Sequence, residues 1–243
     1  RSVIALPLVL FMVRLQQGNL RLRSKRMGGL FLRGLLSVGA FVFFLIGLKV
    51  MPLTETFALF ISSPLLVAAL AGPMLGEPAT GRQWVAVLLG FGAVLFIIRP
   101  GSSVPMLGAL AMTFSVICFS VSIILTRRLG RTESASLITV YVMLTFVLVS
   151  GIISPIGWVV PTTSDFLLMA TIGVIASVAM FCTITAYTNV TPPLAAPFQY
   201  VQLVWAMIIG FFVWGDVPEP SIIMAAAVIV VAGVYVLRVE GSH

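Results

Sequence analysis

The feature that most constrains this chain is a series of nine nearly continuous apolar segments, most of them about twenty residues long. A helix of that length crosses a hydrocarbon core of roughly 30 Å, whereas barrel strands are about half as long and alternate in polarity. Only 9% of the residues are charged, against about a quarter in a soluble domain. We therefore predict an all-α polytopic membrane protein. The predicted spans are Ser2–Val13, Leu30–Gly47, Thr54–Leu75, Gln83–Ile98, Met106–Leu125, Ser136–Trp158, Phe166–Tyr187, Leu194–Trp214 and Ile222–Leu237.

An internal duplication relates the two parts of the chain. Gly47–Pro78 aligns with Ala186–Val217 at an offset of 139 residues (186 minus 47). Both stretches run from a turn with Pro and Thr, through an apolar helix, to a Gly followed by a carboxylate, Gly76-Glu77 and Gly215-Asp216. Duplication in a polytopic membrane protein is typical of a carrier built from two halves around a central site.

The two halves, residues 1–101 and 102–243, differ in their number of spans. The first has four predicted spans and the second has five, because Met106–Leu125 has no counterpart upstream. We expect one further helix before Arg1, which gives ten in the intact protein. Five helices per half is an odd number, so the halves should form two inverted helical repeats.

The basic residues indicate topology and argue against nucleic-acid binding, despite a net charge of +7. They cluster in the Arg14–Arg33 loop and around Arg127–Arg131. Placing both loops in the cytoplasm and alternating from there puts eleven of the fourteen Lys and Arg residues inside, as the positive-inside bias requires. The C-terminus is then also cytoplasmic. The partners that this predicts are the lipid bilayer and a small-molecule substrate, and no nucleic acid.

The motif content argues against an enzyme and against a bound cofactor or metal. The single His is His243, and the chain contains no HExxH, GxSxG or phosphate-loop motif. We also find no ring of like residues that would indicate a channel filter. Without a nucleotide-binding motif, transport would be driven by the substrate gradient or by protons.

Candidate site residues occur first on the Thr54–Leu75 segment. Glu55 is its one carboxylate and has two compatible interpretations, a charge at the helix start or a site for a cationic substrate or a proton. Ser62 lies two turns further on the same face. Ser63 and Pro64 follow near mid-span, where proline is expected to bend the helix and free a carbonyl.

The second set of candidates lies on the repeat-equivalent Leu194–Trp214 segment. Gln199 and Gln202 share one helix face, with Tyr200 and Trp205 nearby in sequence. An amide in lipid needs a partner, which is either a neighbouring helix or a ligand. We expect the polar faces of the two equivalent segments to meet, and Tyr187 to close the site on the cytoplasmic side.

A third polar stripe, formed by Ser115, Cys118 and Ser122, is interpreted as helix packing.

The ordered motifs resemble those of the drug/metabolite transporter superfamily, specifically the EamA-type permeases. The resemblance covers essentially the whole chain, and its elements are the basic loop, Gly34, Ser63-Pro64, Gly76-Glu77, Trp84, Gly90 with Gly92, and Gly215-Asp216. It implies a ten-helix inner-membrane carrier whose site lies between the third, fourth, eighth and ninth helices of the complete protein.

These observations together predict a secondary transporter that moves a small metabolite across the bacterial inner membrane by alternating access, with proton coupling left open. The alternative is a membrane scaffold, assembly or sensor protein that transports nothing. The sequence also leaves a homodimer open.

Overall fold

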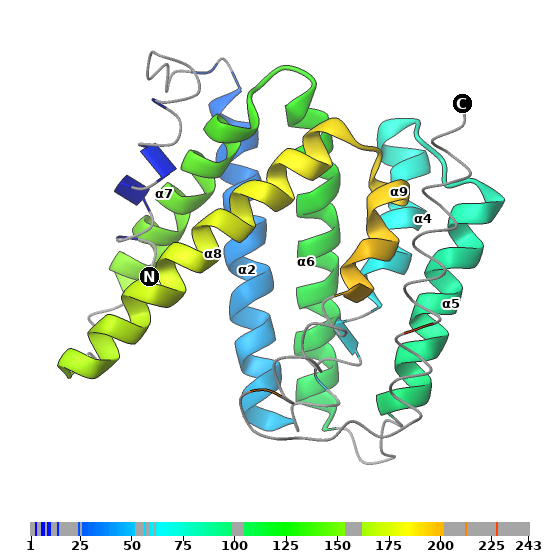
Figure 1. The fold of residues 1–243 in the computed structure, drawn as a ribbon, viewed down its shortest axis with the longest axis horizontal. Coiled ribbons are helices and arrows are strands. Elements are labelled where there is room, and N and C mark those ends of the chain that lie inside the picture. The colour runs from blue at the N-terminus through cyan, green and yellow to red at the C-terminus, as the bar shows by residue number, and fades with distance from the viewer. Residues whose placement is uncertain are drawn as a thin grey trace. The chain divides into compact units, whose positions relative to one another are not determined.

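The structure is a computed structural model that describes residues 26–51, 62–98, 105–153 and 162–201, together with positions 3, 6, 7, 9, 10, 14, 24, 56, 59, 60, 212 and 227. Its described elements are helical (Figure 1). They are α2 (Met27–Val50), α4 (Ser63–Leu75), α5 (Gly81–Ile98), α6 (Met106–Gly130), α7 (Ala135–Ile153), α8 (Thr163–Asn189), α9 (Pro192–Ala195) and the 3₁₀ helix η1 (Ala196–Tyr200).

Four of these helices, α2, α6, α7 and α8, are long and apolar enough to cross a membrane. The prediction of an all-α polytopic membrane protein is therefore confirmed. The helices α2, α6 and α8 also extend beyond the apolar spans into their polar flanks. The first and last predicted spans lie largely outside the described residues.

The chain forms two compact units, and each contains residues from both halves of the sequence. The first unit consists of Arg1–Gly39 with Leu125–Val190, and the second of Ala40–Ile124 with Thr191–His243. The helices α2 and α6 therefore contribute one part to each unit.

The core of the first unit is an apolar cluster contributed by the beginning of α2, the end of α6, and the helices α7 and α8. Its buried members are Leu30, Val38, Leu129, Leu137, Ile138, Tyr141, Val142, Phe146 and Ile184. Gly34 permits the close approach of α2 and α7, because a Cβ at this position would lie 2.7 Å from the Cβ of Thr145. In Figure 1, α7 and α8 run side by side.

In the second unit, aromatic rings and small residues hold the helices together. Phe60 packs between Phe44 and Phe119, with ring centroids 5.3 and 5.2 Å away. The hydroxyl of Ser115 donates to the backbone carbonyl of Ala40 at 2.7 Å. That bond joins α6 to α2, which agrees with the packing role predicted for Ser115. The helix α4 contacts α5, α9 and η1 (Figure 1).

Candidate substrate site

The first element of the site is an interruption in the segment that the sequence predicts as one helix, Thr54–Leu75. Residues 56, 59 and 60 are helical, Ser62 is a turn, and α4 begins at Ser63. The hydroxyl of Ser62 donates to the carbonyl of Leu59 at 2.6 Å. Pro64 lies in the first turn of α4, where its missing N–H has no helical partner to lose. The segment is therefore interrupted where the sequence predicts a bend, and Pro64 lies in the first turn of the helix that follows the interruption.

The repeat-equivalent segment is also irregular. The predicted helix Leu194–Trp214 begins instead with the short α9, continues as the 3₁₀ helix η1, and is helical again at Val201. The offset of 139 residues aligns Val201 with Ser62 (201 minus 62). The 3₁₀ segment therefore ends one position before the residue equivalent to the turn at Ser62, and its own equivalents in the first repeat, residues 57–61, are helical at 59 and 60. Within a membrane, irregular backbone is tolerated where protein buries it or where it lines a cavity.

The two irregular segments meet through Ser63 and Gln199. The hydroxyl of Ser63 donates to the side-chain oxygen of Gln199 at 3.4 Å, and Ser63 is 1% exposed. The backbone carbonyl of Ser63 accepts a bond from the hydroxyl of Ser120 on α6, also at 3.4 Å. Segments 136 residues apart in sequence are thus joined by side-chain contact, and α6 is tied to the same point.

Tyr200 anchors η1 on α5. Its side chain is 1% exposed, and its hydroxyl donates to the carbonyl of Val87 at 3.2 Å. The ring lies against Gly90 so closely that a Cβ built on this glycine would overlap it. The small residue at position 90 therefore lets η1, and with it Gln199, approach α5.

A capping box fixes the start of α5 and so places Trp84. The backbone N–H of Thr80 donates to the Gln83 side-chain oxygen at 2.8 Å, and the Gln83 N–H donates to the Thr80 hydroxyl at 3.3 Å. This reciprocal pairing satisfies two backbone donors that a helix start leaves open. Trp84 is the next residue and projects from the first turn of α5.

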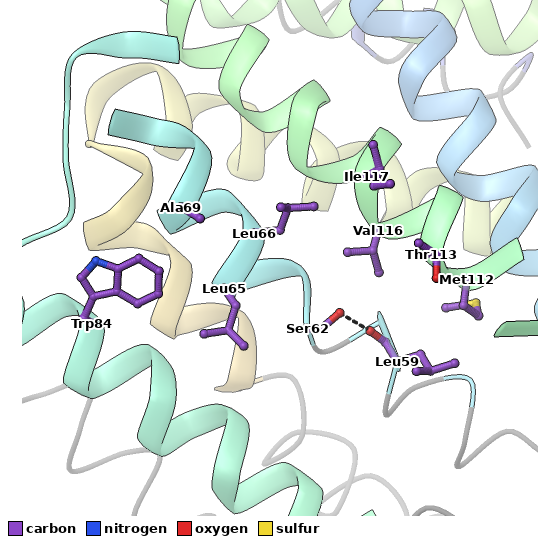
Figure 2. Close-up of a pocket in the computed structure, with 10 residues that line it drawn as sticks. All are labelled: Leu59, Ser62, Leu65, Leu66, Ala69, Trp84, Met112, Thr113, Val116 and Ile117. Carbon is purple, nitrogen blue, oxygen red and sulfur yellow. Dashed lines mark hydrogen bonds between the residues drawn. The ribbon is translucent and has the colours of Figure 1, made fainter. Parts of the chain in front are cut away.

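A pocket of about 420 Å³ lies beside the interruption at Ser62. Its polar lining groups are the hydroxyls of Ser62 and Thr113 and the indole of Trp84. In Figure 2 the α4 residues lie between Trp84 of α5 and the lining residues of α6. The remaining lining residues are Leu59, Leu65, Leu66, Ala69, Met112, Val116 and Ile117. The volume falls within the range of roughly 300–1,000 Å³ of small-molecule sites.

The pocket is suited to binding and does not offer groups for catalysis. None of its ten lining residues carries a formal charge. Both lining hydroxyls already donate to backbone carbonyls, Ser62 to Leu59 and Thr113 to Ala109 at 2.8 Å. Their remaining lone pairs can accept hydrogen bonds from a ligand. Among the described residues, no group of three or more His, Cys, Asp or Glu side chains gathers as metal ligands.

The structure brings together five of the nine candidate site residues, all in the second unit: Ser62, Ser63, Pro64, Gln199 and Tyr200. Tyr187 is 4% exposed and belongs to the first unit, and its closing role stays a prediction. Glu55, Gln202 and Trp205 lie outside the described residues.

Sequence reasoning did not assign Trp84, Thr113 or Ser120 to the site. Trp84 was a motif residue of the resemblance, and an aromatic one helical turn after a capping Thr is a signal that could have found it. Ser120 and Thr113 carry no comparable signal, because isolated hydroxyls in an apolar helix more often bond their own backbone.

The profile of the EamA-like transporter family matches residues 1–99 and matches again over residues 106–239. A solved crystal structure superposes with a TM-score of 0.83 over 96% of this chain and 83% of its own, at 18% identity. That likeness concerns the fold alone.

Several named relatives align over most of the chain. The S-adenosylmethionine uptake transporter of Rickettsia bellii is 25% identical over 98% of this chain and 80% of its own length. The riboflavin transporter of Rhizobium johnstonii is 26% identical over 80% of this chain and 65% of its own length. The riboflavin transporter of Vibrio cholerae is 25% identical over 90% and 74%, respectively.

Proposed function

This chain belongs to the EamA-like transporter family, and from that premise we propose that it is a secondary carrier that works by alternating access. It is a multi-pass membrane protein and a transporter of a small metabolite, not an enzyme. The scaffold or sensor alternative is not favoured, because the named relatives are transporters. We further propose its transport mechanism, the membrane in which it lies, its orientation in that membrane and its substrate site.

The observation that carries the proposal is the pocket beside the helix interruption at Ser62. Carriers built from repeats place their substrate where discontinuous helices meet at the repeat interface. Here the interruption at Ser62 lies on the pocket wall. The next residue, Ser63, bonds Gln199 of the equivalent irregular segment. Rearrangement of the segment around Ser62 would change the shape of the pocket, which is what alternating access requires of a substrate site, and the bond to Gln199 links that segment to its repeat equivalent.

We place the protein in the bacterial inner membrane with its C-terminus in the cytoplasm. The support is the distribution of basic residues, eleven of fourteen on one side, because positively charged loops remain cytoplasmic during insertion. Proton coupling through Glu55 and assembly as a homodimer stay predictions from the sequence.

For the substrate we propose a metabolite that carries a planar nitrogen heterocycle. The relatives named above transport S-adenosylmethionine and riboflavin, and both of these compounds contain such a ring. In this chain Trp84 supplies an aromatic face at an otherwise largely aliphatic wall. Offset stacking of two aromatic rings contributes about 0.5–1.5 kcal/mol beyond the burial of their area. The uncharged lining favours a neutral ring in the pocket itself.

The test is counterflow exchange in liposomes with the purified protein. The panel contains S-adenosylmethionine, riboflavin, adenosine, and aliphatic amino acids as compounds without a ring. We expect exchange of a ring-bearing compound, retained in Trp84→Phe and weakened about threefold to tenfold in Trp84→Ala. Exchange that is equal in both variants would remove Trp84 from the site. A folded protein that exchanges only ring-free compounds would refute the substrate class and leave the carrier assignment intact.

A further inference from the structure

The first unit contains a buried arginine with an incomplete set of partners. Arg33 lies in α2 and is 2% exposed. Its Nε donates to the hydroxyl of Thr126 on α6 at 2.9 Å, while its Nη1 is buried and has no hydrogen-bond partner. A guanidinium stays protonated in proteins, so its charge cannot be removed by deprotonation. Burying a charged donor without an acceptor is strongly unfavourable. Binding of a group that supplies this acceptor would remove that cost and would therefore be favourable in free energy.

A second buried polar atom in the same unit also has no partner. The hydroxyl oxygen of Thr185 on α8 is buried and forms no hydrogen bond. A mid-helix threonine usually donates to the carbonyl one turn earlier, as Thr183 does to Ala179 in the same helix. Among the described residues, these two side-chain atoms, Arg33 Nη1 and Thr185 Oγ1, are the buried ones that lack any partner. Both can donate to an oxygen atom.

The apolar core and α6 place the two residues at the same end of the unit. Leu30, which precedes Arg33 by three positions and so shares its helix face, belongs to the same buried cluster as Ile184, the neighbour of Thr185. Thr126 accepts the bond from Arg33. The adjacent Arg127 donates from Nη1 to the carbonyl of Thr188 at 2.8 Å, one helical turn after Thr185. The last two turns of α6 therefore contact both the part of α2 that carries Arg33 and the end of α8, one turn beyond Thr185.

We propose that Arg33 and Thr185 form a binding site for an oxyanionic group, a carboxylate or a phosphate. The guanidinium presents its remaining N–H groups to two oxygens of such a group, while Thr126 fixes its orientation through Nε. The Thr185 hydroxyl supplies a neutral donor. The site lies where α2 begins and α6 and α8 end, and it does not rest on the substrate proposed above. Because both atoms are covered by protein, the anion enters when these helix ends part.

The test measures the melting temperature of the full chain in a maltoside detergent, which contains no phosphate. Inorganic phosphate replaces chloride at constant ionic strength, and a second series adds phosphatidylglycerol, with bound lipid counted by native mass spectrometry. Stabilisation by phosphate without lipid identifies a soluble anion as the ligand. Stabilisation only by phosphatidylglycerol identifies a lipid headgroup. A melting temperature that responds to neither ligand would overturn the proposal.

Three variants separate a binding site from a structural role. Arg33→Gln should weaken the apparent anion affinity about tenfold or more, whereas Arg128→Gln should leave it unchanged. Arg128 is exposed and lies near the same end of α6, so it is matched in charge. Thr185→Val tests the site without removing a charge. Its melting temperature without anion should not fall, because the hydroxyl has no partner, but its anion response should weaken several-fold.

If Arg33→Gln does not fold, Thr185→Val remains a complete test. An undiminished anion response in Thr185→Val, or an equal loss in Arg33→Gln and Arg128→Gln, would contradict the assignment.

Discussion

Replacing Gly90 by alanine should destabilise the second unit, because the added methyl group would overlap the ring of Tyr200. Tyr200 cannot move aside freely, since it is 1% exposed and its hydroxyl is bonded to Val87. Overpacking of this kind costs about 1–3 kcal/mol. It is partly offset by the higher helix propensity of alanine, about 1 kcal/mol over glycine.

The matched control is Gly92→Ala in the same helix. A Cβ at Gly92 would meet nothing within 4 Å, so this variant gains the propensity contribution without the overlap. The propensity contribution is common to both variants. The difference between their unfolding free energies therefore isolates the overlap, about 1–3 kcal/mol with Gly90→Ala the less stable.

The assay is thermal unfolding of both variants in the same detergent, followed by counterflow. At about 2–4 °C per kcal/mol for a chain of this size, Gly90→Ala should melt roughly 2–12 °C below Gly92→Ala. Its transport should also fall, because displacement of η1 moves Gln199 away from Ser63. In a Tyr200→Ala background the difference between the two variants should disappear, as coupled residues require. Equal melting temperatures in the native background would refute the close packing of η1 on α5.

Three further predictions concern the site and its supports. Glu55→Gln should abolish transport driven by a pH gradient while leaving the melting temperature unchanged, and an unaltered pH dependence in liposomes would remove Glu55 from the mechanism. Gln199→Ala and Gln202→Ala should each raise the substrate concentration for half-maximal counterflow more than Ser115→Ala does, and equal effects would count against the site. Thr80→Ala should lower the unfolding free energy by about 1 kcal/mol, measured by thermal unfolding, because it removes the cap of α5.

Helix positions could be predicted from the sequence because membrane insertion requires long apolar runs. The predicted start of α6 at Met106 and the end of α5 at Ile98 agree with the structure. The predicted positions of helix ends that lie in polar sequence were less accurate. The helix α8 begins three residues before the predicted Phe166, since a capping box of Thr162 and Asp165 extends it. The local cap chemistry, which hydropathy does not register, decides such boundaries.

The contact between Ser63 and Gln199 was foreseeable in kind, because repeat-equivalent helices are expected to meet around a shared axis. The packing of the Tyr200 ring against Gly90 could not be foreseen from the sequence. In the sequence Gly90 is a glycine of the motifs that carry the family resemblance, and nothing in the sequence says which helix approaches this position. That information depends on the 3₁₀ geometry of η1, which changes the direction in which Tyr200 points. A signal for this geometry was present at Pro197, whose missing N–H weakens a regular α-helix at that point.

The two helix interruptions are more informative than either proline near them. Pro64 lies two residues after the break at Ser62, whereas Pro197 lies four residues before Val201, the position equivalent to Ser62. The 3₁₀ segment is equivalent to residues 57–61 and ends one position before the equivalent of Ser62, so each irregular segment has its own position in its repeat. The two segments nevertheless meet, because Ser63 bonds Gln199 beside the pocket. Contact between two irregular segments next to a pocket is what a carrier that rearranges around its substrate would need.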